Sequence, residues 1–143
     1  METTKILFDK IKEFEGCRLQ AYQDAARVWT IGYGHTKGVR RGDRITQEQA
    51  DEYLREDIEE VERQVLALGL NLTQPQFDAL VSFTFNVGIG NFKESTLLRF
   101  IREGRSENDI KRQFRSWVYA NGRTLPGLVK RREWESIRYF SLF

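Results

Sequence analysis

The chain has 143 residues, of which 40% are hydrophobic and 31% are charged, and its formal net charge is +2. This length favours one domain with a sizeable core, and the balanced charge argues against nucleic-acid binding through a strong overall field. A single cysteine and a single histidine exclude an intramolecular disulfide and a zinc site built from clusters of these residues. No apolar run approaches the roughly 20 residues of a membrane span. We therefore expect a soluble domain with no metal, no cofactor and no stable membrane insertion.

The first 45 residues predict a short helix followed by a small antiparallel sheet. Leu7, Ile11 and Phe14 share one helical face, a threonine at position 3 or 4 can cap the start, and Gly16 suits the end. Beyond residue 17 the helical spacing disappears, glycines recur, and residues 29–33 are rich in strand-forming side chains. This change of pattern indicates strands joined by tight turns.

The remainder of the chain predicts helices. A capping box at Thr46 to Gln49 opens a long helix with a single apolar stripe that ends near residue 69, as suits a connector between two lobes. A second capping box at Thr73 to Gln76 opens a segment that is apolar on nearly all sides, which is typical of a central buried helix. After a glycine break at 88–90, shorter helices are expected near 95–103, 106–118 and 127–139, with a turn at 121–122. The fold class is α+β.

Charged residues are distributed unevenly. Acidic residues dominate 44–63, which we interpret as a solvated helix face supported by pairs four residues apart. Basic residues dominate 111–138. There a solvated face and a surface that attracts an anionic polymer are equally open.

Three polar residues near the predicted helix–sheet junction could perform chemistry. Glu15 follows the apolar face of the first helix, and Asp24 and Thr30 follow it in order along the chain. Two carboxylates brought together at such a junction are the minimal equipment for glycoside hydrolysis, with one protonated as general acid and the other ionised. Spacing alone does not distinguish this set from three unrelated surface residues.

The context of these residues resembles a known family. The sequence Trp-Thr-Ile-Gly-Tyr-Gly-His from Trp29 to His35, with Glu15 and Asp24 at these offsets, resembles the phage-type lysozymes, the endolysins of glycoside hydrolase family 24. The resemblance covers residues 6–139. Further matching segments follow in order: Phe85-Asn86-Val87-Gly88, Ser95-Thr96-Leu97-Leu98, Trp117, Pro126-Gly127-Leu128, and Arg131-Arg132.

The resemblance implies a fold and an activity. It implies a single catalytic domain over 1–143 with a lysozyme-like bilobal fold. A small antiparallel sheet lobe, about 15–60, would be joined by a long helix, 46–69, to a mainly helical lobe formed by 1–14 and 73–143. The implied enzyme is a lysozyme, an N-acetylmuramidase that hydrolyses the β-1,4 bond between N-acetylmuramic acid and N-acetylglucosamine of peptidoglycan. Its stereochemistry stays open, since inversion requires carboxylates roughly 6.5–9.5 Å apart and retention about 5–5.5 Å.

The resemblance also implies roles for individual residues. Glu15 would protonate the leaving oxygen, Asp24 would stabilise positive charge or activate water, and Thr30 would position that water. Phe85 and Ser95 would line the saccharide cleft.

Other side chains are weighed separately. The resemblance implies that His35 and Asp57 form a structural ion pair rather than a second acid–base site. Cys17 could be a reactive thiol, although a lone cysteine is more often a small buried hydrophobe, which we expect here. Arg131 and Arg132 could neutralise Glu15 or bind peptide carboxylates, or Arg131 could simply pair with an acid four residues onward.

The resemblance finally implies a phage or prophage lysis enzyme. It would be a monomer that folds in the host bacterial cytoplasm and acts on the glycan strands of the wall after release by a separate holin, with no nucleic-acid partner. The charged N-terminal segment, which lacks a secretory signal pattern, fits this expectation. Two alternatives remain: a lytic transglycosylase on the same bond, and a noncatalytic module that binds the wall or nucleic acid.

Overall fold

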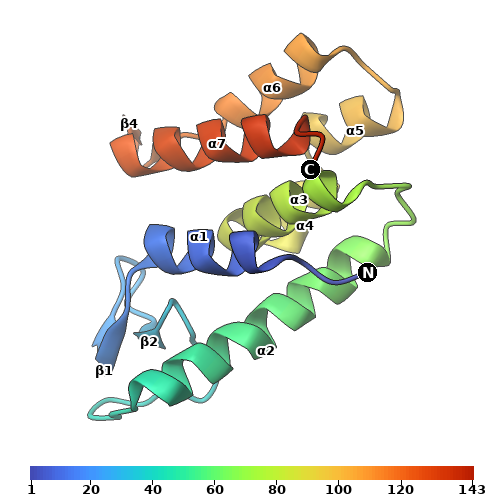
Figure 1. Ribbon diagram of the computed structural model, residues 1–143. Helices are drawn as coiled ribbons and strands as arrows, with labels where there is room; N and C mark the ends of the chain where they lie inside the picture. Colours follow the sequence, from blue (N-terminus) through green and yellow to red (C-terminus); the bar gives the residue numbers. More distant parts are fainter. The chain divides into compact units, whose positions relative to one another are not determined.

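The computed structural model describes residues 1–143 (Figure 1). These residues form two compact units. One unit is Phe8–Glu60, and the other combines Met1–Leu7 with Val61–Phe143. Both divisions fall within helices, in α1 (Lys5–Glu15) and in α2 (Gln47–Leu66), so the units are joined by continuous helical backbone. The predicted α+β class is confirmed.

The Phe8–Glu60 unit contains the sheet. Strand β1 (Arg18–Gln23) pairs with the antiparallel strand β2 (Trp29–Gly32), and Tyr22 lies opposite Thr30. A bridge between Gln20 and Arg44 adds a third segment of backbone beside β1. The predicted small antiparallel sheet is therefore confirmed.

Helix α1 ends as its sequence indicates. Gly16 adopts a φ of 67°, a left-handed conformation that glycine reaches without steric penalty, and its N–H donates to the Lys12 carbonyl at 3.0 Å. The start of the helix is capped by Thr4, whose hydroxyl accepts from the Leu7 N–H at 3.3 Å. The last residue of α1, Glu15, is thus held on well-defined backbone.

Both predicted capping boxes are present. At the start of α2, Thr46 N–H donates to the Gln49 side chain at 2.9 Å, and the Thr46 hydroxyl accepts from Gln49 N–H at 3.1 Å. At the start of α3 (Gln74–Val87), Thr73 and Gln76 exchange the equivalent bonds at 2.9 and 3.3 Å. Such caps satisfy helical N–H groups that have no partner within the helix.

The second unit is a helical assembly around α3. It contains α4 (Ile89–Lys93), α5 (Thr96–Arg102), α6 (Glu107–Arg115) and α7 (Pro126–Tyr139), as well as a short hairpin of β3 (Tyr119–Ala120) and β4 (Arg123–Thr124). Figure 1 shows α7 alongside α6, and α7 also contacts α3. The sequence predicted the turn within the hairpin and missed both the hairpin strands and α4.

The core of this unit is aromatic. Phe83 on α3 is fully buried, and its ring meets those of Phe92, Phe114 and Trp117 edge-to-face, with centroids 5.5–5.8 Å apart. Each such ring pair adds about 0.5–1.5 kcal/mol to the hydrophobic gain. The prediction that this helix is central and buried is confirmed.

Buried charges in the same unit are paired. Asp78 on α3, which has no exposed surface, accepts from the guanidinium of Arg138 on α7 at 2.8 and 3.2 Å and from the Thr4 N–H at 3.0 Å. Asp78 therefore ties the start of α1 to α7.

No helix of the structure combines the length and apolar character that a membrane span requires.

Candidate active site

Asp24 lies at the tip of the β1–β2 hairpin, where its carboxylate organises the turn. Its Oδ1 accepts from the N–H groups of Ala26 and Val28 at 2.8 and 2.9 Å, while its own N–H donates to the Val28 carbonyl at 3.0 Å. Arg27 completes the turn with a φ of 64°. Because the side-chain contacts all involve Oδ1, the other carboxylate oxygen of this exposed residue stays available to water or substrate.

Thr30 is linked to Asp24 through one peptide group. The Thr30 hydroxyl donates to the Val28 carbonyl at 2.9 Å, and the same oxygen accepts from the Asp24 N–H. Thr30 is only 4% exposed. With its proton engaged, the hydroxyl oxygen can only accept a further hydrogen bond, so it can orient a water molecule.

Glu15 belongs to the same unit and lies against the turn that follows β2. This turn comprises Gly32, Tyr33 and Gly34 and is closed by paired hydrogen bonds of 2.9 Å between Ile31 and His35. A β-carbon at position 34 would lie 3.3 Å from Oε1 of Glu15 and 3.9 Å from its Cδ. The Glu15 carboxylate therefore lies against the backbone of Gly34, a residue with no side chain. Gly34 follows Thr30 by four residues in the sequence.

A polar network joins α1, this turn and α2. Lys12, one helical turn before Glu15, lies 3.3 Å from an Asp51 carboxylate oxygen and 5.5 Å from the centre of the Tyr33 ring. Gln47 donates to the Tyr33 hydroxyl at 2.9 Å and to Asp51 at 3.0 Å. These contacts fix the last turn of α1 relative to the Gly32–Gly34 turn.

His35 lies outside the acid–hydroxyl set. Its Nδ1 is 2.8 Å from Oδ2 of Asp57, its ring stacks on Tyr53 with centroids 4.2 Å apart, and its Nε2 lies 3.1 Å from the Lys37 carbonyl. Both ring nitrogens are engaged with protein atoms and the residue is buried. Burial raises the pKa of Asp57, and the facing His35 opposes that rise. This geometry suits a structural tie between the turn and α2.

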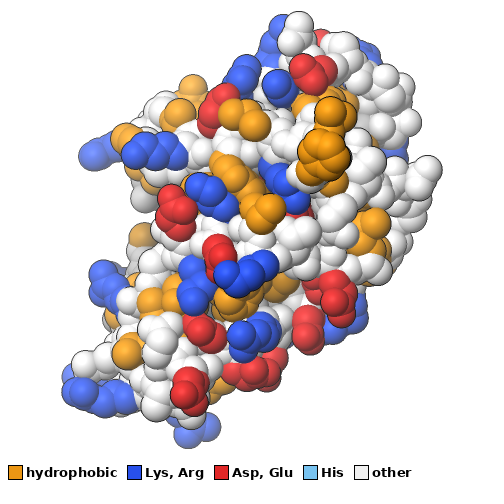
Figure 2. Space-filling model, in the orientation of Figure 1, with side chains coloured by type: hydrophobic (Ala, Val, Ile, Leu, Met, Phe, Trp, Pro, Cys, Tyr) orange, Lys and Arg blue, Asp and Glu red, His pale blue; other side chains and the backbone are white.

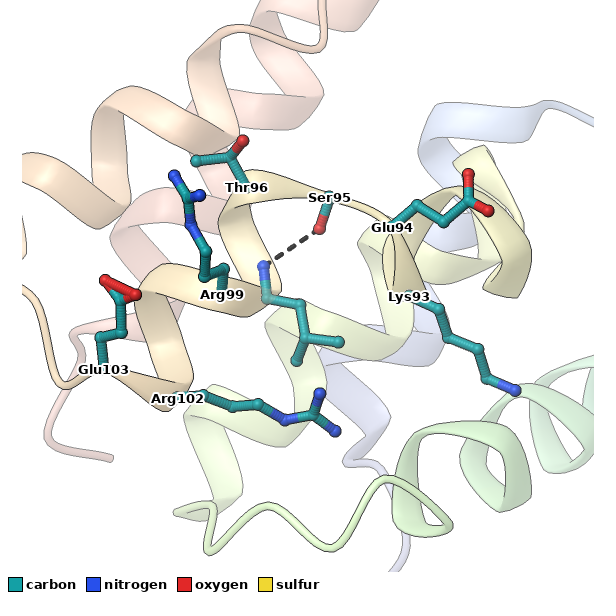
Figure 3. Close-up of a pocket in the computed structure, with 8 residues that line it drawn as sticks. Lys93, Glu94, Ser95, Thr96, Arg99, Arg102 and Glu103 are labelled. Atoms are coloured by element: carbon teal, nitrogen blue, oxygen red, sulfur yellow. Dashed lines mark hydrogen bonds between the residues drawn. The ribbon is translucent and has the colours of Figure 1, made fainter.

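Phe85 and Ser95 belong to the helical unit. Phe85 is half-buried on α3. Ser95 is the N-cap of α5: its hydroxyl accepts from Leu98 N–H at 3.0 Å and donates to the Phe92 carbonyl at 2.7 Å. It lines an open cavity of about 350 Å³ (Figure 3). The lining residues all come from 93–103 and include Arg99 and Arg102. Phe85 is not among the residues that line this cavity.

Several basic side chains of the segment 111–138 are paired with carboxylates. Arg115 pairs with Glu133 at 3.0 Å, and Arg131 pairs with Glu135, four residues onward, at 3.4 Å. Arg131 also donates to the Ser82 carbonyl at 2.9 Å. On the face shown in Figure 2, Lys and Arg side chains are interspersed with Asp and Glu. Electrostatic attraction to an anionic polymer is correspondingly weakened.

The expectation for Cys17 is wrong. The residue is exposed, and its Sγ lies 3.8 Å from the Gln47 side-chain oxygen. It follows the left-handed Gly16, where the chain leaves α1 for β1. The structure contains no cluster of three or more His, Cys, Asp or Glu side chains arranged to hold a metal ion.

The three candidate residues, two carboxylates and a hydroxyl, all belong to the Phe8–Glu60 unit, and such a set of groups can perform glycoside hydrolysis. The sequence model of the phage lysozyme family matches residues 12–135. The chain belongs to this family and is an enzyme of the lysozyme type.

Individual relatives agree with the family match. The chain is 45% identical over 136 residues to an endolysin of Acyrthosiphon pisum secondary endosymbiont phage 1, covering 92% of each chain. It is 43% identical over 129 residues to an endolysin of Bacillus phage B103 but spans only 49% of that protein's length. Among solved structures, the muramidase domain of SpmX from Asticaccaulis excentricus is similar with a TM-score of 0.89 and 40% identity, covering 98% of both chains. The lysozyme-like fold expected from the sequence is thereby confirmed.

Proposed function

We propose that this protein is an endolysin-type N-acetylmuramidase, a single catalytic domain that hydrolyses the β-1,4 bond between N-acetylmuramic acid and N-acetylglucosamine in peptidoglycan. Membership of the phage lysozyme family supports the reaction class. The observation that carries the assignment of the site is the position of the Glu15 carboxylate on the turn that directly continues the Asp24–Thr30 hairpin.

In this proposal Glu15 is the general acid. Its carboxyl group donates a proton to the glycosidic oxygen as the bond to the anomeric carbon breaks, so that the leaving sugar departs as an alcohol. Its placement at the last residue of α1, against a rigid turn, favours a fixed direction for that proton.

Asp24 and Thr30 act on the second reactant, which is a water molecule. The free oxygen of Asp24 accepts a proton from the water, and the Thr30 hydroxyl, whose own proton is bound to Val28, accepts the water's second hydrogen bond. The water oxygen attacks the anomeric carbon as its proton passes to Asp24, so the carboxylate still faces the positive charge of the ring while that charge develops. Because Thr30 is buried, it would hold one water molecule rather than bulk solvent.

Phe85 and Ser95 are proposed to contribute to glycan binding, and the His35–Asp57 pair is proposed to hold the turn on α2. Phe85 presents a half-buried ring of the kind that packs against sugar faces. Ser95 caps the start of α5 and so fixes the backbone at that end of the helix. If Phe85 binds glycan, Phe85→Ala raises KM with little change in kcat, and an unchanged KM excludes it from the glycan path.

The products of sacculus digestion test the reaction directly. Purified protein is incubated with peptidoglycan, and the released muropeptides are weighed by mass spectrometry. Hydrolysis predicts fragments that have gained one water molecule, with reducing muramic acid ends. Anhydro ends without added water would instead establish a transglycosylase, and an absence of fragments would contradict the proposed hydrolysis.

The route to the wall is a separate proposal, supported by the endolysin relatives. We propose that the protein accumulates as a monomer in the host cytoplasm and reaches the wall when a holin permeabilises the membrane. Bacteria expressing the chain should stay intact until chloroform is added and then lyse within minutes. Lysis without permeabilisation would contradict this route.

A further inference from the structure

We propose that Gly34 is a positioning residue for Glu15: its lack of a side chain sets the place of the acid's carboxylate. The inference rests on the proposed role of Glu15 as general acid. It concerns a residue with no reactive group of its own, which acts only through the space that it leaves open.

The close approach is specific to this glycine. A β-carbon at 34 would lie 3.3 Å from Glu15 Oε1, whereas ordinary contacts of a β-carbon begin at 3.4 Å. Other glycines of the same unit with positive φ, such as Gly38 and Gly42, have nothing within 4 Å of that position. Gly34 therefore combines a left-handed φ of 81° with a steric demand that those two lack.

The turn side of the contact cannot yield easily. The turn is closed by the Ile31–His35 hydrogen bonds, and between its two glycines the buried Tyr33 is anchored through its hydroxyl to Gln47. On the other side, the final turn of α1 holds the backbone of Glu15, so the end of its side chain is the part that can move. A side chain at position 34 must therefore be accommodated chiefly by movement of the Glu15 carboxylate, by a few tenths of an ångström.

A displacement of this size matters to a general acid. Proton transfer needs the donor oxygen within hydrogen-bond reach of the leaving oxygen, and a misplacement of about 1 Å can reduce a rate about 100-fold. We expect Gly34→Ala to lower kcat about tenfold while KM, which reports glycan binding, stays within about twofold. The corresponding Gly42→Ala variant, with a φ of 87° and open space around its β-carbon, is the matched control and should keep kcat within about twofold.

A stability cycle tests the contact without relying on activity. Urea unfolding is measured for Gly34→Ala and Gly42→Ala, each in the parent and in a Glu15→Ala background. If the methyl group presses on the carboxylate, removing that carboxylate relieves part of the loss caused by Gly34→Ala and none of the loss caused by Gly42→Ala. A merely structural glycine would give equal losses in both backgrounds.

The outcomes separate the inference from the proposed function. Folded Gly34→Ala protein with more than half of the parent kcat, or equal stability losses in both backgrounds, would overturn the role of Gly34. If Gly34→Ala does not fold, recovery of folding in the Glu15→Ala background supports the contact, and failure to recover overturns it. Full activity of Glu15→Gln would overturn the assignment of the acid while leaving the stability cycle interpretable.

Discussion

Asparagine and alanine at position 24 separate the structural role of Asp24 from its chemical role. The carboxylate accepts two backbone N–H groups through one oxygen, at 2.8 and 2.9 Å. An asparagine side-chain carbonyl occupies the same position and can accept both bonds, but it carries no charge and cannot take a proton from water. An alanine loses the turn contacts as well as the chemistry.

The structure sets the expected magnitudes. Each hydrogen bond contributes about 0.5–1.5 kcal/mol net, and the turn is exposed, so that water can replace the lost acceptor. We therefore expect Asp24→Ala to lower the free energy of unfolding by about 1–2 kcal/mol. Asp24→Asn should change it by about 0.5 kcal/mol or less. Both variants should lose about 10²–10⁴-fold in kcat, because both remove the group that activates water or stabilises the charged ring.

Two measurements on the same samples decide the matter. Urea unfolding gives the stability difference, and the clearing of chloroform-treated Gram-negative cells gives the rate. The reasoning is refuted if Asp24→Asn retains more than a tenth of the parent rate. It is also refuted if asparagine and alanine destabilise the fold equally, because asparagine should keep the two turn contacts that alanine loses.

Two further predictions concern stability. Burial raises the pKa of Tyr139 to about 12; since the folded state favours the neutral phenol, stability should fall above pH 10, by about 1 kcal/mol at pH 11 relative to pH 9. Urea unfolding at both pH values should show this fall in the parent and not in Tyr139→Phe, and identical pH dependence would contradict it. Asp78→Ala should cost about 3–5 kcal/mol of unfolding free energy, because it leaves the buried Arg138 without its carboxylate. The exposed pair Lys10–Glu13 is the control, since Lys10→Ala should cost less than about 1 kcal/mol, and equal losses in the two variants would disprove the argument.

Features governed by neighbouring residues were predictable from the sequence. Both capping boxes formed as expected because Thr46 and Thr73 act on backbone only three residues away. The central burial of α3 was predictable because the helix carries apolar side chains on nearly all of its faces. The five-residue helix α4 and the two-residue strands β3 and β4 escaped because so few residues carry no detectable periodicity.

Features governed by tertiary contacts were not predictable. Cys17 has an ordinary local sequence, and its exposure depends on which other parts of the chain pack against the start of β1. Gly34 looks like any turn glycine until the Glu15 carboxylate is found against it. Much of the positive charge in 111–138 is matched by carboxylates, as for Arg138 and Asp78, which are 60 residues apart in the chain.

The catalytic roles of Glu15, Asp24 and Thr30 came from a resemblance, and they remain predictions that the observed geometry supports. The hairpin joins two of these residues through the Val28 carbonyl, which accepts from both, and no spacing rule specifies this link. The contact of Glu15 with the following turn adds the third.

The rate of Glu15→Gln on chloroform-treated cells addresses the general acid most directly. Glutamine preserves the size of the side chain but has no carboxyl proton to give to the departing sugar. Clearing should slow by at least about 100-fold, with an unfolding midpoint close to that of the parent. A folded Glu15→Gln protein that clears the cells as fast as the parent would show that the proton comes from elsewhere.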